Sequence, residues 1–239
     1  MSRGGENLNA SAESEYRYEI KFAHASFFGS HLLIEAIKQH PAIFREIYAG
    51  RRVNNIYFDT VDYLTVNDNV SGYADREKIR IRWYGKSLGK IRPVLELKRK
   101  VGSVGTKTKY ELKSAFRKNT QTIEDLLRPC LQGLSKPADE ILSCVRPTLM
   151  NTYDRRYFVS ACGGYRITLD ENVNFYSVGR GMISRVPSAE LDSTHILEVK
   201  YPIHNQKQIY GITKFLPFRL TKSSKYVAGI DLLSRQGLS

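Results

Sequence analysis

The chain has 239 residues, with 37 Lys and Arg against 24 Asp and Glu, which gives a formal net charge of +13 at pH 7. Hydrophobic residues make up 41% of the sequence, so the chain can bury a core and is not a disordered basic tail. The excess positive charge predicts an anionic partner: a nucleic acid, an acidic membrane surface or a phosphate-rich ligand. No apolar run approaches the roughly 18 residues of a membrane-spanning helix, so we expect no transmembrane segment.

Residues 1–15 are polar and lack the apolar stretch of a signal peptide, so they are predicted to form a disordered tail. A single domain is expected over residues 16–239. The cysteines Cys130, Cys144 and Cys162 have no paired Cys or His neighbours, which is typical of reduced thiols in a cytoplasmic protein. The five histidines are scattered, and none is assigned to catalysis.

Alternation of apolar and charged residues is the main local signal, and its period of two residues is that of a strand. In chain order, strands are predicted over residues 16–22, 53–58, 78–84, 94–100, 106–113, 153–159, 165–170 and 196–201. Helical spacing predicts helices over residues 27–39, 122–127, 138–145 and 206–216, the middle two within or beside a helical insertion at 128–147. Many strands, few helices and no βαβ rhythm predict an α+β fold with an antiparallel sheet.

The charged faces of these strands carry more bases than acids. The bases are Lys21, Lys78, Arg80, Arg82, Lys98, Lys100, Lys107, Lys109, Lys113, Arg155, Arg166 and Lys200. The acids are Glu19, Glu96, Glu111, Asp170 and Glu198. An ordinary sheet with a solvated charged face stays an alternative, although such faces usually mix the two signs.

If the sheet closes on itself, the excess of bases on its charged face would line an interior channel instead of a solvated surface. An antiparallel sheet of about eight strands can close into a tunnel, with helices packed against its apolar outer face. Its lumen would then be cationic, which is costly unless a polyanion fills it. Such a lumen is too narrow for a nucleic-acid duplex but fits a linear chain of phosphates.

Known phosphate-binding loops are absent from the sequence. The segment Gly85-Lys86-Ser87 resembles the end of a Walker A motif, but Arg80 stands where the first glycine should be. No GxGxxG, HExxH, GxSxG or kinase motif occurs. Phosphate binding therefore has to come from side chains on strands.

Six short motifs occur in a fixed order, at residues 80–85, 95–98, 153–156, 166–170, 196–200 and 224–229. Together they resemble the vacuolar transporter chaperone (VTC) polyphosphate polymerase domain, a branch of the triphosphate tunnel (CYTH-like) superfamily. The resemblance extends from about residue 16 to residue 232. It implies an antiparallel β tunnel that is open at both ends and whose walls bind ATP phosphates and the growing polyphosphate.

The resemblance also implies roles for individual residues. Arg80 and Arg82 match the paired arginines that grip nucleotide phosphates, and with Lys98 and Lys225 they are the predicted catalytic residues. Further phosphate-binding residues are predicted from the same resemblance: Lys21, Lys109, Arg155, Arg166 and Lys200. Arginine suits this role because its planar fork binds two phosphate oxygens at once and stays charged.

The resemblance further implies a divalent metal. Glu198 matches the carboxylate that holds Mn²⁺ or Mg²⁺, and Glu19 is a second candidate. Both metals take oxygen ligands, and the phosphates themselves can complete the coordination shell.

One departure from the wider superfamily bears on the reaction. Its hydrolases carry Glu-x-Glu-x-Lys on the first strand, whereas Arg17 stands in this chain in place of the first glutamate, before Glu19 and Lys21. The resemblance therefore favours an ATP-dependent polyphosphate polymerase over a triphosphatase that acts on inorganic triphosphate or nucleotide ends. A non-catalytic polyphosphate-binding module would carry nearly the same motifs, so this alternative stays open.

The partners expected from this interpretation are ATP, inorganic polyphosphate, and pyrophosphate or triphosphate, and a membrane protein could receive the polymer. No nucleic-acid motif is present, so no nucleic acid is expected. Aromatic residues near the basic strands are interpreted as packing residues rather than as platforms for bases: Trp83, Tyr84, Tyr153 and Tyr157.

Overall fold

The computed structural model describes residues 17–25, 30–101, 104–118, 122–178, 183–186, 194–216, 219–221 and 224–238. The strands are β1 (Arg17–Ala25), β2 (Arg45–Asp59), β3 (Asp75–Tyr84), β4 (Gly89–Ile91), β5 (Val94–Val101), β6 (Val104–Glu111), β7 (Ala115–Arg117), β8 (Arg146–Val159), β9 (Arg166–Ser177), β10 (Ser184–Val186), β11 (Thr194–Pro202) and β12 (Arg219–Leu220). The helices are α1 (Ser30–Lys38), α2 (Leu64–Ser71), α3 (Ile123–Leu131), α4 (Lys136–Ser143), α6 (Ile209–Thr213), α7 (Lys225–Arg235) and the 3-10 helix η2 (Ile203–Gln208). The predicted tail at residues 1–15 lies outside the described residues.

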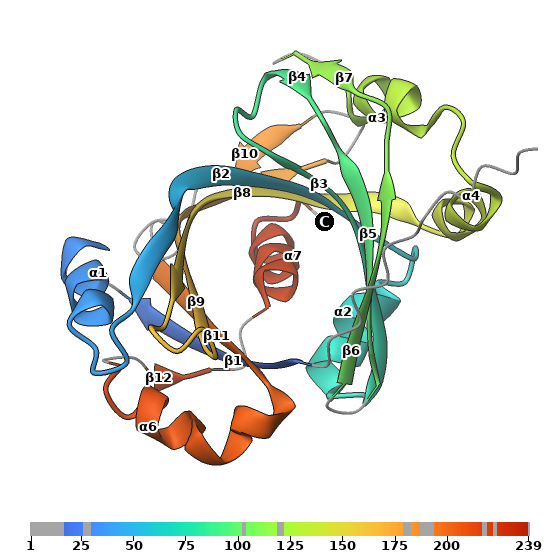
Figure 1. The fold of residues 1–239 in the computed structure, drawn as a ribbon. Coiled ribbons are helices and arrows are strands. Elements are labelled where there is room, and N and C mark those ends of the chain that lie inside the picture. Colours follow the sequence, from blue (N-terminus) through green and yellow to red (C-terminus); the bar gives the residue numbers. More distant parts are fainter. Residues whose placement is uncertain are drawn as a thin grey trace, which may run out of the picture.

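One antiparallel sheet forms the body of the molecule and curls into a ring (Figure 1). Its strands follow the order β12-β1-β11-β9-β8-β2-β3-β5-β6, and β10 pairs with β9. Backbone hydrogen bonds do not close this ladder within the described part of the chain. Instead β1 approaches β6, and Lys98 Nζ on β5 lies 3.1 Å from Glu19 Oε2 on β1. The predicted α+β fold with an antiparallel β tunnel is confirmed.

The alternation along the strands separates an apolar outer face from a charged inner face. On one side of the ring, Phe22, Leu197 and Ile167 pack outward in a core that also contains residues of α1 and α6. On the other side, Ile81 and Trp83 pack outward with residues of α3 and α4. Because successive strand residues point to opposite faces, this burial turns the charged positions of the same strands inward.

Helix α7 departs from the prediction that the helices lie outside, because it packs on the inner face of the sheet (Figure 1). The ring of Tyr226 stacks on that of Tyr57 from β2, with centroids 4.9 Å apart. The Tyr226 hydroxyl donates to Asp59 Oδ2 at 2.8 Å. Ser224 caps the helix by accepting from Val227 N, and Lys225 in the first turn contacts Asp170 in the charged part of the lumen.

Gly229 gives α7 its close approach to the sheet. A Cβ atom at this position would lie 2.4 Å from Leu149 Cδ2 and 2.6 Å from Phe175 Cδ1. Gly229→Ala is therefore expected to lower the free energy of unfolding by about 1–3 kcal/mol, as overpacking of a core does. Gly211→Ala, in α6, is the matched control: an added Cβ would meet nothing within 4 Å beyond the neighbouring backbone, so the change should stabilise by about 0.5–1 kcal/mol. Urea unfolding measures both, and equal effects would contradict the packing of α7.

None of the helices in the described part of the chain has the length and hydropathy of a membrane span.

Candidate functional site

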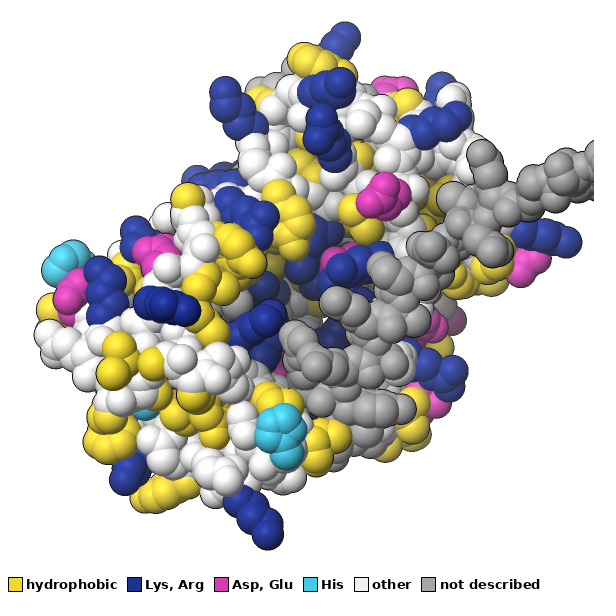
Figure 2. All heavy atoms as spheres, in the orientation of Figure 1, with side chains coloured by type: hydrophobic (Ala, Val, Ile, Leu, Met, Phe, Trp, Pro, Cys, Tyr) yellow, Lys and Arg dark blue, Asp and Glu magenta, His cyan; other side chains and the backbone are white. Residues whose placement is uncertain are grey.

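Charged side chains from almost every strand of the ring meet on its inner face. In Figure 2, Lys and Arg side chains surround the hollow at the centre of the view. The cations of the inner face that make ion pairs or polar contacts there are Lys21, Lys78, Arg80, Arg82, Lys98, Lys107, Arg155, Lys200 and Lys225. The carboxylates among them are Glu19, Glu96, Asp170 and Glu198. The cations outnumber the carboxylates, so the lumen retains a net positive charge.

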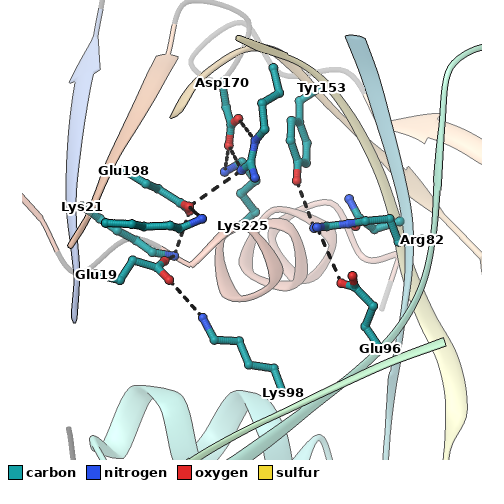
Figure 3. A network of polar contacts seen from close by, with 12 residues as sticks. Glu19, Lys21, Arg82, Glu96, Lys98, Tyr153, Asp170, Glu198 and Lys225 are labelled. Atoms are coloured by element: carbon teal, nitrogen blue, oxygen red, sulfur yellow. Dashed lines mark hydrogen bonds and ion pairs between the residues drawn. The ribbon is translucent and has the colours of Figure 1, made fainter. Parts of the chain in front are cut away.

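Asp170 on β9 is the most deeply buried of these carboxylates and holds two cations. Arg155 on β8 donates to it from Nε and Nη2 at 2.5 and 2.7 Å, and Lys225 Nζ lies at 2.5 Å (Figure 3). Lys225 Nζ also lies 4.7 Å from the ring centroid of Tyr153. Burial by itself would raise the pKa of Asp170, but Arg155 and Lys225 hold that pKa below its ordinary value.

Glu19 and Glu198 converge on one ammonium group. Lys21 Nζ lies 3.2 Å from an oxygen of each, and Lys200 Nζ lies 3.1 Å from the other oxygen of Glu198 (Figure 3). Burial and the neighbouring Glu198 would raise the pKa of Glu19, yet Lys21 and Lys98 lower it to about 2. The pKa of Glu198 is likewise well below its ordinary value, since Lys21 and Lys200 outweigh its burial. Both side chains therefore stay ionised at neutral pH.

Glu96 on β5 organises the opposite part of the wall. Arg80 contacts it through Nη2 at 2.7 Å, Arg82 Nη1 lies at 3.6 Å, and Lys107 is a third partner. Arg82 also donates to Asn55 Oδ1 at 2.8 Å and to the Tyr153 hydroxyl at 3.2 Å. These contacts fix both guanidinium groups on the inner face, where a planar fork can bind phosphate oxygens.

The family of the chain follows from a match over most of its length. Residues 16–234 match the family model described as the VTC domain. The chain belongs to the VTC domain family. No curated protein matches the sequence.

Solved structures of low sequence identity share the fold of this VTC domain. A protein from Pyrococcus horikoshii OT3 has 13% sequence identity and a TM-score of 0.51, covering 90% of this chain and 99% of its own. A Hippeastrum protein, named as an adenylyl cyclase candidate with a dominant triphosphatase activity, has 16% identity and a TM-score of 0.50. The match covers 94% of this chain and 97% of the Hippeastrum chain. At this level of identity the likeness shows the fold alone.

The structure of the VTC domain places all the predicted site residues on the inner face. Seven of the predicted cations lie within the three carboxylate clusters: Lys21, Arg80, Arg82, Lys98, Arg155, Lys200 and Lys225. Lys109 is paired in register with Glu96, and Arg166 with Lys200, so both share this face. Both are exposed, and neither makes an ion pair with a residue that the structure describes. Among the predicted site cations, these two are therefore exposed and lack a carboxylate partner within the described ranges.

Sequence reasoning misses several residues that hold this site together. Glu96 and Asp170 count among the acids of the charged faces with no predicted role, although they anchor the wall arginines. Tyr153 is predicted to be a packing residue, yet its hydroxyl accepts from Arg82. Asn55 carries no sequence signal, because the predicted strand around it is apolar and aromatic rather than charged.

The residues of the VTC domain that could hold a divalent metal are two carboxylates. Glu19 and Glu198 point at a common position, now held by the Lys21 ammonium, and carboxylate oxygens suit Mg²⁺ or Mn²⁺. No cluster of three or more His, Cys, Asp or Glu that could bind a metal occurs in the described ranges. The pair therefore fits a metal that takes its remaining ligands from phosphate and water.

Lys78 is a partly buried lysine of the lumen that has no carboxylate partner among the described residues. Its Nζ donates to Ser224 Oγ, the cap of α7, at 2.9 Å. Burial and the nearby charges of Lys21 and Lys98 lower the pKa of Lys78 to about 7. The unfolded chain has the ordinary lysine pKa of about 10.4, so it binds more protons than the folded chain between those values. Stability therefore rises with pH across this window, and the charged form is the costly one.

Lys78→Met is expected to stabilise the protein, and by more at pH 6 than at pH 9. Methionine removes the charge that is costly to bury at low pH, whereas wild-type Lys78 is already neutral at pH 9. Urea unfolding at the two pH values gives the difference between variant and wild type. Lys86→Met, on the exposed turn after β3, controls for the loss of a surface lysine. A gain for Lys78→Met that is equal at both pH values would contradict a lysine discharged by burial.

Proposed function

We propose that this VTC domain is an ATP-dependent polyphosphate polymerase that transfers the γ-phosphoryl group of ATP to a polyphosphate chain inside the tunnel. The observation that carries this proposal is the cationic inner face, to which seven strands and the first turn of α7 contribute side chains. A continuous lining of this kind suits a linear polyanion, because each phosphate meets a cation as the chain advances. Membership of the VTC family supports the same phosphate chemistry.

Phosphoryl transfer needs little covalent help from the protein. The bond between the γ-phosphorus of ATP and its bridging oxygen breaks, a terminal polyphosphate oxygen bonds to that phosphorus, and ADP leaves. The acceptor oxygen is already anionic, so no side chain has to act as a general base. The tasks that remain are to align the two phosphates and to neutralise the charge on the transferred group.

The wall residues fit these two tasks. Arg80 and Arg82 present planar forks from β3, which suits them to hold the nucleotide phosphates in line with the acceptor. Lys225 stands at the first position of α7, where the helix dipole adds to its positive charge. Lys98 and Lys21 supply compact charges along the path of the polymer.

Glu198 and Glu19 are the residues that would hold a divalent metal, which would neutralise phosphate charge when bound. The same carboxylates contact Lys21, Lys98 and Lys200. A phosphate chain in the tunnel would compete with these carboxylates for the three lysines. The wall cations are thus held in place before a ligand arrives, which lowers the entropy cost of binding it.

The test is to incubate the protein with ATP and either Mn²⁺ or Mg²⁺, and to separate the products on a gel stained for polyphosphate. A ladder of polyphosphate with an equivalent release of ADP is expected. If neither metal gives a ladder or ADP, the proposal of a polymerase is wrong.

A second candidate function is a triphosphatase, because the Hippeastrum protein of the same fold is credited with a dominant triphosphatase activity. Release of inorganic phosphate from tripolyphosphate, without any polymer from ATP, would select it. Binding of polyphosphate without turnover of either substrate would select a binding module instead.

A further inference from the structure

Three tyrosine rings surround one arginine at the end of the inner face away from α7. The Arg51 guanidinium carbon lies 4.7 Å from the ring centroid of Tyr84, 4.9 Å from that of Tyr157 and 5.6 Å from that of Tyr48. The rings of Tyr48 and Tyr157 meet edge to face, with centroids 5.7 Å apart. Arg51 makes no ion pair with a carboxylate within the described ranges. Its guanidinium group lies over the aromatic faces and also donates a hydrogen bond to the Tyr157 side chain.

An irregularity in β2 brings these residues to the same face. The pairing of β2 with β8 shifts register between Tyr48 and Arg51, so both side chains point inward although three positions separate them. Tyr48 then pairs with Tyr157, and Arg51 pairs with Arg155 in the lumen wall. Register shifts of this kind re-aim side chains and occur often beside functional sites.

The cluster continues the phosphate-binding wall without a break. Tyr84 is the next inward residue after Arg82 on β3, and Tyr157 is the next after Arg155 on β8. Two residues of an extended strand advance by about 6.8 Å. The wall therefore changes from guanidinium groups to aromatic rings over one such step, as a nucleotide changes from phosphates to ribose and base.

The rings are open to a ligand. Tyr48 is 57% exposed and Tyr84 is 46% exposed, whereas Trp83 beside it is 1% exposed in the outer core. Large aromatic side chains on a rim offer flat apolar faces that water solvates poorly, and heteroaromatic bases stack on such faces. Arg51 holds the rings in position and adds a cation with a planar face of its own.

We propose that Tyr48, Arg51, Tyr84 and Tyr157 form a platform that stacks the base of a nucleoside triphosphate whose phosphates lie against Arg80 and Arg82. This inference rests on the proposed function, under which nucleotide phosphates enter the lumen. It also revises the interpretation of Tyr84 and Tyr157 as packing residues.

The test compares ATP with inorganic tripolyphosphate, which has the phosphates but no base. Isothermal titration calorimetry in chelator, where transfer does not proceed, gives both affinities for each variant. Tyr84→Ala is expected to lower ATP affinity about tenfold and to change tripolyphosphate affinity less than twofold. Tyr84→Phe keeps the ring and should bind ATP within about twofold of wild type. Tyr210→Ala, at an exposed tyrosine of α6, is the matched control and should change neither affinity.

Three outcomes are distinguished by these affinities. A selective loss of ATP affinity supports the platform. An unchanged ratio of the two affinities, both in Tyr84→Ala and in a variant that also carries Tyr48→Ala, overturns it while tripolyphosphate still binds. Wild-type protein that binds neither compound overturns the proposed function itself, and the platform with it.

Discussion

Replacing Arg80 and Arg82 together by alanine is expected to abolish most of the rise in melting temperature that tripolyphosphate causes in the wild-type protein. An anion that binds only the folded state stabilises it by mass action, so the rise reports binding. Each charge-assisted hydrogen bond contributes about 1.5–3 kcal/mol, so loss of both arginines should weaken binding by about a hundredfold or more. Thermal unfolding across a tripolyphosphate titration measures the effect.

The double substitution also deprives Glu96 of two of its three partners, so the fold itself is weakened. Adding Glu96→Gln removes the unbalanced carboxylate and separates stability from binding. Arg99→Ala is the matched control, because Arg99 points outward from β5 and pairs only with the exposed Asp75 among the described residues. A full melting-temperature rise in the double variant would show that the anion binds somewhere other than the tunnel.

Asp170→Asn is expected to be the most destabilising single change in the tunnel wall. The substitution leaves Arg155 and Lys225 almost fully buried without their shared carboxylate. Breaking a buried ion pair from one side costs about 3–5 kcal/mol, which urea unfolding will resolve. Tripolyphosphate should then raise the melting temperature of the variant by more than that of wild type, because the anion replaces the lost negative charge.

The matched control for Asp170→Asn is Asp154→Asn on the neighbouring strand β8. The side chains of Asp154 and its partner Arg52 are each 34% exposed, although their contact at 2.7 Å is nearly as short as those of Asp170. A pair in contact with water contributes about 0–1 kcal/mol, so Asp154→Asn should be mild. Equal effects of the two substitutions would contradict a buried anchor at Asp170.

Strand alternation allows the fold and the lining of the tunnel to be predicted from sequence. A period of two residues identifies which side chains share a face, and the imbalance of charge on that face indicates that it turns inward. For Lys98 and Lys200 this is sufficient, since each lies on a strand with clear alternation. The assignment of the basic face to the lumen is confirmed by their neighbours in the ring.

Contacts across the ring cannot be predicted in the same way. Lys98 meets Glu19 from 79 positions away in the sequence, and no local pattern specifies that distance in space. Helix α7 is not predicted because Gly229 interrupts its helical signal. The close approach of the helix to Leu149 and Phe175 explains the glycine. Helix α2 is not predicted either, because it has no buried residue and therefore shows no apolar face in the sequence.

The wall of the tunnel carries its own counterions. A basic surface in solution is neutralised by small anions, and their release on binding makes phosphate affinity fall steeply with added salt. In this tunnel Glu96, Asp170 and Glu198 are fixed beside the cations and cannot diffuse away. A phosphate chain that enters has to separate pairs within the wall, at a cost that added salt barely changes. The affinity for polyphosphate should therefore depend on ionic strength less steeply than the number of lumen lysines and arginines suggests.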